Sequence, residues 1–325
     1  GWAPYSGPSP HTDHVHFSLT RRGGSGSVSF YNPTYRAPAR WTPTSRRVGD
    51  VRVGARWDGV TPLSGDFDGD GYDDLLWYDP ASGPALVWFS RGDGRFVGRQ
   101  VNMGAGRIPL VGDFNGDCRD DIFWYGPGAM PDRQWQGRRN RTFRSVAEQM
   151  NDTYTRPFVG DFNGDRADDI FWYEPGPGAD RMWRGSPYGF VARNANMRGD
   201  HVPVPGDFDG DFRDDILWYG PGGAPDRLWY GRGNGFVGRR VSYAADRIPV
   251  PGDYNGDDRT DILWYGVGEV PDRMWLGRST RGFKGANVDS DRPYASAVAA
   301  DVDGDTHDDV FWHQSPFHED RLWRY

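Results

Sequence analysis

The sequence predicts an all-β fold, a β-propeller whose blades each contain four short strands. Two observations support this fold class. A nine-residue acidic loop recurs six times, at intervals of 46 to 48 residues, which is a typical length for one propeller blade. Between the copies, short apolar segments alternate with turns rich in Gly and Pro. This pattern is expected of four-stranded blades and disfavours long helices.

The acidic loop has nearly the same composition in every copy. The six copies, which we call cradles 1 to 6, begin at Asp66, Asp113, Asp161, Asp207, Asp253 and Asp301. Each has Asp at position 1, Asp or Asn at position 3, Gly at position 4, and Asp at positions 5 and 9. Oxygen atoms on alternate residues of a tight loop can converge on one point, and hard cations prefer oxygen ligands. We therefore interpret each loop as a cation-binding cradle.

The unit around cradle 4 shows the predicted blade most clearly. Strands are expected at residues 202–204, 215–219, 227–230 and 236–241, with the cradle between the first two. Residues 14–54 fit the same template without a cradle, with strands at 15–19, 27–33, 39–41 and 51–53. The sequence therefore predicts seven blades in a single domain over residues 1–325: one without a calcium loop, and six with it over residues 55–325.

The last predicted unit is short, because the chain ends at Tyr325 after the third strand. We expect residues 2–10, near the N-terminus, to add the missing strand and so close the ring. Closure would remove an exposed strand edge that invites aggregation. The alternative is six blades with a separate N-terminal hairpin.

The cradles predict about six calcium ions as cofactors. Calcium is favoured over magnesium because it accepts many oxygen ligands in a flexible geometry. The alternative is an Asp/Asn/Gly turn without metal. With position 7 contributing only its carbonyl, the predicted ligands are Asp66, Asp68, Asp70, Tyr72 and Asp74; Asp113, Asn115, Asp117, Arg119 and Asp121; Asp161, Asn163, Asp165, Ala167 and Asp169; Asp207, Asp209, Asp211, Arg213 and Asp215; Asp253, Asn255, Asp257, Arg259 and Asp261; and Asp301, Asp303, Asp305, His307 and Asp309.

The loop pattern, Asp-x-Asp/Asn-Gly-Asp-x-x-x-Asp on a blade-length period, resembles the FG-GAP and VCBS repeats. Those repeats form the calcium-binding propellers of integrin α-subunit heads and of many secreted bacterial proteins. The resemblance covers about residues 55–325. It implies calcium binding, a secreted or extracellular location, and adhesion or ligand binding.

Further repeated residues suggest a core and a recognition face. The Trp-Tyr or Trp-His pair after each cradle is expected in the core. An Asp-Arg pair opens the third strand of five units, at residues 132–133, 180–181, 226–227, 272–273 and 320–321, and we interpret its Asp as a turn cap. Arginines also recur on the connections between blades, at the end opposite the cradles. These arginines are candidate ligand-binding residues for a glycan, through forked hydrogen bonds, and they are Arg133, Arg181, Arg227, Arg273, Arg321, Arg107, Arg156 and Arg247.

Composition excludes several classes of function. The formal net charge of −8 disfavours nucleic acid as a partner, and no stretch is apolar enough for membrane insertion. The single cysteine, Cys118, excludes an internal disulfide. We find no Ser/His/Asp set and no nucleotide-binding loop, so we expect no enzymatic activity.

The predicted function is a secreted, calcium-stabilised binding module that recognises carbohydrate or a cell-surface ligand, as a lectin does. A protein–protein adhesion module is the first alternative. The segment from His11 to His16 could ligate zinc and resembles the terminal His-x-His segment of bacterial cell-wall metallopeptidases. A metal-dependent hydrolase, or the non-catalytic propeller part of such a peptidase, is therefore the second alternative.

Overall fold

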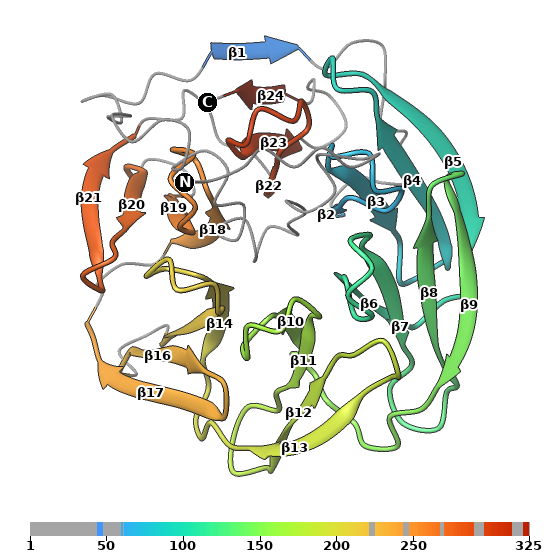
Figure 1. Ribbon diagram of the computed structural model, residues 1–325, viewed down its shortest axis with the longest axis horizontal. Helices are drawn as coiled ribbons and strands as arrows, with labels where there is room; N and C mark the ends of the chain where they lie inside the picture. The colour runs from blue at the N-terminus through green and yellow to red at the C-terminus, as the bar shows by residue number, and fades with distance from the viewer. Residues whose placement is uncertain are drawn as a thin grey trace, which may run out of the picture.

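The protein forms a ring of six β-sheets around a central axis, as seen in the computed structural model (Figure 1). The structure describes residues 44–47, 60, 62–220, 225–242, 247–266, 270–288, 296–313 and 321–324. Within these ranges, no helix has the length and hydrophobicity needed to cross a membrane. Each sheet contains four antiparallel strands and forms one blade.

Five blades are made of consecutive strands. Blade 1 contains β2 (Leu63–Gly65), β3 (Asp74–Tyr78), β4 (Pro84–Ser90) and β5 (Phe96–Asn102); blade 2 contains β6 (Ile108–Gly112), β7 (Asp121–Tyr125), β8 (Asp132–Arg138) and β9 (Thr142–Glu148); blade 3 contains β10 (Phe158–Gly160), β11 (Asp169–Trp172), β12 (Asp180–Arg184) and β13 (Val191–Ala195); blade 4 contains β14 (Val202–Gly206), β15 (Asp215–Tyr219), β16 (Arg227–Arg232) and β17 (Gly235–Arg240); blade 5 contains β18 (Ile248–Gly252), β19 (Asp261–Tyr265), β20 (Arg273–Gly277) and β21 (Phe283–Asn287).

Blade 6 takes one strand from the other end of the chain. It contains β22 (Ser296–Ala300), β23 (Asp309–His313) and β24 (Arg321–Arg324), and β1 (Thr44–Arg47) pairs antiparallel with β24. The first strands of successive blades lie side by side around the axis, including β22 beside β2 (Figure 1). Cradles join the first and second strands of each blade, as the sequence predicts.

The prediction of seven blades is wrong, because the strands that the structure describes form six sheets. Residues 14–54 have the alternating pattern of strands, but the one strand described there, β1, adds to blade 6. An alternating pattern predicts strands without specifying their partners, since pairing is a long-range contact. The predicted closing strand, residues 2–10, lies outside the described residues, so closure by that segment is not shown. All four strands predicted within residues 14–54 also lie outside the described residues, and β1 was not predicted as a strand.

Burial changes systematically from the second strand of a blade to the fourth. Every residue of β7 and of β15 is buried, because a second strand is covered on both faces by neighbouring blades. The fourth strands, such as β13 and β17, are mostly exposed and carry charged residues. Charged side chains on these outer edges disfavour pairing with another sheet.

Aromatic rings connect each blade to the next, which confirms the prediction that the Trp-Tyr and Trp-His pairs belong to the core. Trp124 is fully buried and meets Tyr78 of blade 1 edge-on at 5.0 Å between ring centroids. It also packs edge-on against Trp135 in its own blade, at 5.4 Å. The same pairing recurs around the ring, and His313 of blade 6 meets Trp77 of blade 1 at 5.2 Å. Edge-to-face contacts of this kind add to the stability gained from burial alone.

Candidate metal-binding loops

The first Asp of each cradle holds the loop in shape. In cradle 1, Asp66 Oδ1 accepts hydrogen bonds from the N–H groups of Gly69 and Asp70, at 2.8 and 3.1 Å, and Asp66 Oδ2 accepts one from Gly71 N–H at 2.9 Å. The same arrangement recurs in cradles 3, 4 and 6. These N–H donors favour the ionised form of the carboxylate and partly offset the opposing effect of burial.

Position 6 of the cradle has a left-handed backbone, which the sequence prediction missed. Position 6 is Gly71 in cradle 1, but Phe212 in cradle 4 has φ 63°, where a bulky side chain is strained. The N–H of Phe212 donates to Asp207 Oδ2 at 2.8 Å, so the first Asp fixes this backbone. The other non-glycine residues at position 6 with positive φ are Cys118, Arg166, Asp258 and Thr306.

Position 8 joins each cradle to the preceding blade, which the sequence analysis also missed. Asp120 Oδ2 in cradle 2 accepts a hydrogen bond from Asp66 N–H at 2.9 Å, and Asp120 N–H donates back to the Asp66 carbonyl at 2.9 Å. Asp168, Asp214, Asp308 and Asp73 make the same reciprocal pair, the last with Asp301 across the junction of blades 6 and 1. The five aspartates at position 8 were visible in the sequence, but their partner in the preceding blade was not.

The junction of blades 4 and 5 is different. Position 8 is Thr260, whose N–H still donates to the Asp207 carbonyl at 2.8 Å. Among the described residues, no hydrogen-bond partner reaches its buried Oγ1. This junction therefore lacks the carboxylate contact that the five Asp-containing junctions have.

Position 7 also has a role beyond its carbonyl. The position 7 side chain of each blade lies against the Gly at position 4 of the preceding blade, as Arg119 does against Gly69 and Tyr72 against Gly304. A Cβ atom on Gly69 would come within 2.8 Å of Arg119. Glycine is therefore needed at position 4 both for its positive φ and for this close approach. Arg119 and Arg259 additionally form ion pairs with Asp117 and Asp257, the fifth residues of their own loops.

Three cradles bring carboxylate oxygens together closely enough for a single cation. One oxygen from each member of a triad lies within 4.8 Å of the others, and the triads are Asp66, Asp68 and Asp70; Asp207, Asp209 and Asp215; and Asp301, Asp303 and Asp305. Oxygens 2.3–2.6 Å from a calcium ion are at most about 5 Å apart, so the spacing fits. The predicted ligands Asp74, Asp211 and Asp309 belong to the same loops but not to these triads.

Buried carboxylate oxygens in these loops fit a cation. Asp68 and Asp209 have side chains that are only 3% and 5% exposed. Within the described part of the chain, neither Asp68 Oδ1 nor Asp209 Oδ1 has a hydrogen-bond partner. A buried oxygen without a donor is costly unless something positive meets it. A divalent cation bound by the triad would supply that charge.

The electrostatics of the loops lead to the same conclusion. Burial, together with repulsion from neighbouring carboxylates, raises the pKa of Asp66 to about 8, that of Asp309 to about 9 and that of Asp207 to about 7. Burial also raises the pKa of the ninth residue well above its usual range in Asp74, Asp121, Asp169, Asp215 and Asp261. Carboxyl groups resist ionisation in such a cluster, and a bound cation reverses that effect.

The six loops fall into two classes according to position 3. Cradles 1, 4 and 6 have Asp there (Asp68, Asp209 and Asp303), and we call them Asp-type cradles. Cradles 2, 3 and 5 have Asn (Asn115, Asn163 and Asn255), and we call them Asn-type cradles. In the Asn-type cradles the amide donates to the ninth residue, at distances of 2.7 to 3.2 Å. In the Asp-type cradles an arginine pairs with the third residue instead.

The Asp of the Asp-Arg motif is a structural cap, as the sequence analysis favoured. Asp132 is buried, and its two oxygens accept hydrogen bonds from the N–H groups of Gly126 and Met150. Asp180 bonds Glu174 and Met197 in the same way. Each Asp therefore ties the turn between the second and third strands to the end of the fourth strand.

The predicted ligand-binding arginines differ in their surroundings. Those on the connections between blades contact the next blade: Arg107 bonds the Pro131 carbonyl, and Arg247 bonds the Pro271 carbonyl at 2.8 Å. Arg156 bonds Asp200 and the His201 carbonyl. Of those on the third strands, Arg181 and Arg273 are exposed, while Arg133, Arg227 and Arg321 are half-buried.

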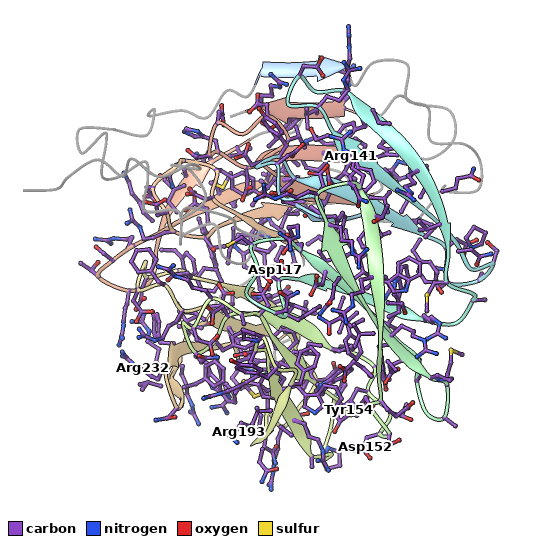
Figure 2. The ribbon with its side chains drawn as sticks, turned by 45° about the vertical axis from the view of Figure 1, so that its right-hand side comes forward. Asp117, Arg141, Asp152, Tyr154, Arg193 and Arg232 are labelled. Carbon is purple, nitrogen blue, oxygen red and sulfur yellow. The ribbon has the colours of Figure 1, made fainter. Side chains whose placement is uncertain are left out.

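Arg181 lies in a polar cluster between blades 2 and 3. It pairs with Asp152 at 3.3 Å. Nearby, Tyr154 is buried and its N–H donates to Tyr125 Oη at 2.8 Å. Figure 2 shows Asp152 and Tyr154 next to each other near the edge of the ring.

The loops and the ring together define a β-propeller with acidic, cation-compatible turns between first and second strands. Residues 66–124 and 113–172 match the model of an FG-GAP-like repeat. The protein is thus a β-propeller that carries FG-GAP-like repeats. The comparison with curated proteins found no match.

Two solved structures share the fold. One is a lectin of Agrocybe aegerita, described as specifically recognising non-reducing terminal N-acetylglucosamine; it is 18% identical, with a TM-score of 0.56, and the match covers 78% of this chain and 74% of the lectin. The other is the Tc holotoxin pore of Photorhabdus luminescens, which is 16% identical, with a TM-score of 0.59; the match covers 88% of this chain and 14% of that chain. At these identities the likeness shows the fold alone.

Proposed function

We propose that this protein is a secreted binding module that recognises carbohydrate and is stabilised by calcium. The observation that carries the calcium part is the buried, unpartnered oxygen of Asp68 or Asp209 inside a triad of carboxylates. Calcium at these sites would be held by Asp side chains and by the position 7 carbonyl. It would neutralise the loop that joins the first two strands of a blade.

The similarity of the fold to a lectin supports carbohydrate as the ligand. A chain of this kind needs no catalytic group, and we propose that it is not an enzyme. The exposed arginines of the third strands, Arg181 and Arg273, are the proposed contacts for hydroxyl or acidic groups of a glycan. The cradles lie at the opposite ends of the strands, so calcium would shape the blades and leave recognition to the arginine-bearing end.

A glycan array probed in calcium and in a chelator tests this proposal. Binding to a defined set of glycans, lost or weakened on chelation, is expected. The array should include glycans with terminal N-acetylglucosamine. Binding to no glycan, combined with binding to a protein ligand, would favour the adhesion module instead.

Two variants test whether Arg181 contributes to glycan binding. Arg181→Gln should weaken glycan binding, because it removes an exposed guanidinium at the proposed face. Arg193→Gln is the matched control, since Arg193 is an exposed arginine on the outer strand β13 (Figure 2). Equal binding by both variants and the unmodified protein would remove Arg181 from the proposed site.

A further inference from the structure

Arginines are paired with the third residue of all three Asp-type cradles. Arg141 Nε donates to Asp68 Oδ2 at 2.6 Å, Arg281 Nε donates to Asp209 Oδ2 at 2.9 Å, and Arg324 Nη1 lies 2.8 Å from Asp303 Oδ2. In each of these aspartates the other oxygen, Oδ1, is buried and has no hydrogen-bond partner among the described residues. Across the described residues, no arginine bonds the side chain of the Asn in an Asn-type cradle.

Arg141 and Arg281 reach their cradles from the next blade. Each lies in the turn between the third and fourth strands of its own blade, Arg141 between β8 and β9 of blade 2 and Arg281 between β20 and β21 of blade 5. Figure 2 shows Arg141 at the end of its hairpin, toward blade 1. Both have a left-handed backbone, with φ 61° and 67°. Glycine holds a positive φ at the corresponding points of blades 3 and 4, at Gly189 in the turn and at Gly235, the first residue of β17.

Aromatic rings hold both guanidinium groups. Arg141 lies over Phe89 of blade 1, with its Cζ 5.4 Å from the ring centroid, and Arg281 lies over Tyr230 of blade 4 at 4.4 Å. Arg141 also reaches Asp70 at 3.3 Å. A strained backbone, a cation–π contact and a carboxylate pair at two equivalent positions show a built arrangement.

We propose that Arg141 and Arg281 are built-in counter-cations that set the calcium affinity of cradles 1 and 4. Each neutralises the extra carboxylate that distinguishes an Asp-type cradle from an Asn-type cradle. The guanidinium keeps the loop folded when calcium is scarce. It also weakens calcium binding, because two positive groups share one carboxylate. This inference rests on the calcium binding proposed above.

The direction of the effect follows from charge. Removing the guanidinium leaves Asp68 available to calcium alone, so calcium should bind cradle 1 more tightly. Each arginine is 35% exposed, so water screens the repulsion and the effect is moderate. We expect the calcium concentration at half-saturation to fall about three- to tenfold.

Amide hydrogen exchange, read by mass spectrometry during a calcium titration, tests this proposal one cradle at a time. In Arg141→Gln, protection of residues 66–74 should appear at lower calcium than in the unmodified protein, and exchange of the same residues without calcium should be faster. Residues 113–121 of cradle 2 and 207–215 of cradle 4 should not change. Arg281→Gln should shift cradle 4 and leave cradle 1 unchanged, which provides a second, independent variant.

Arg139→Gln is the matched control, because Arg139 is an exposed arginine in the same turn as Arg141. The proposal is wrong if cradle 1 shows an unchanged or higher calcium midpoint in Arg141→Gln, or if Arg139→Gln shifts it equally. If no cradle of the unmodified protein gains protection with calcium, the calcium part of the proposed function fails with it. Glycan binding is measured separately by the array.

Discussion

Asp-type and Asn-type cradles limit the negative charge at position 3 in different ways. In cradle 2, Asn115 replaces a carboxylate, and its amide donates to Asp121 Oδ2 at 2.9 Å. In cradle 1, Asp68 retains the charge, and Arg141 from the next blade offsets it. In the six loops, Asn at position 3 therefore occurs with an amide contact to the ninth residue, and Asp occurs with an arginine partner. The six loops have similar sequences, but the charge at position 3 is compensated by different contacts in the two classes.

The largest expected effect is that of removing divalent cations. Each ion bound only by the folded state stabilises it by about 2.7 kcal/mol at a concentration a hundredfold above its Kd. Several cradles losing calcium together should lower the melting temperature by roughly 10 °C or more. Thermal unfolding with calcium, with a chelator, and with magnesium after chelation measures this. Full recovery with magnesium alone would argue against the calcium preference.

The pH dependence of the metal-free protein should be the next largest effect. The pKa values of about 8 for Asp66 and about 9 for Asp309 lie above that of an unfolded Asp. Between the pKa of an unfolded Asp, about 4, and these raised values, the folded state binds more protons than the unfolded state. The stability of the metal-free protein should therefore fall as pH rises from about 4 to about 9.

With saturating calcium the trend should reverse, because calcium binds the deprotonated carboxylates. Melting temperatures across this pH range, in metal-free buffer and in calcium, show both slopes. A metal-free protein that becomes more stable as pH rises would contradict the electrostatics described for the cradles.

Breaking a junction between blades should destabilise the protein less than removing the cations does, but by a measurable amount. Asp120→Ala leaves Asp66 N–H buried without its acceptor and should cost about 1–3 kcal/mol. Asp120→Asn keeps an acceptor oxygen and should cost less. Chemical denaturation of both variants in calcium gives the comparison. Equal losses would mean that the contact acts through charge and not through the hydrogen bond.

Exchanging Asp and Asn at position 3 should change stability least, and it compares the two cradle classes directly. Asp68→Asn removes one carboxylate and leaves Arg141 with Asp70, so without calcium the loss should be below about 1 kcal/mol. Asn115→Asp adds a carboxylate next to Asp121 without a matching arginine, and should cost more under the same conditions. Denaturation of both variants in a chelator tests the order. The reverse order would show that the arginine does not compensate the charge.

The sequence predicted most of the local structure, but little of how the strands assemble into blades. The predicted strand at residues 215–219 agrees with β15, and the predicted strand at 227–230 falls within β16, because apolar runs between Gly and Pro turns define strands locally. The number of blades was wrong because β1 joins blade 6 through a contact between residues 44–47 and 321–324. No local pattern specifies a pairing over that distance.

Some residues of the candidate site were predicted from the sequence and others were missed, for the same reason. Positions 1, 3 and 5 of cradle 1 form a triad, as expected from their spacing within one tight loop. Asp120 and Arg141 were missed because each acts on the loop of a neighbouring blade. Their roles depend on how neighbouring blades pack together. The repeated pattern in the sequence does not reveal that packing.

We propose that calcium occupies the acidic loops and holds the blades in shape. Anomalous X-ray scattering from crystals grown in calcium tests it directly. We predict anomalous density inside the cradles, among the carboxylates of Asp66, Asp68 and Asp70 and at the equivalent positions of the other loops. Well-ordered cradles without anomalous density, at calcium concentrations of about 1 mM or above, would contradict the claim.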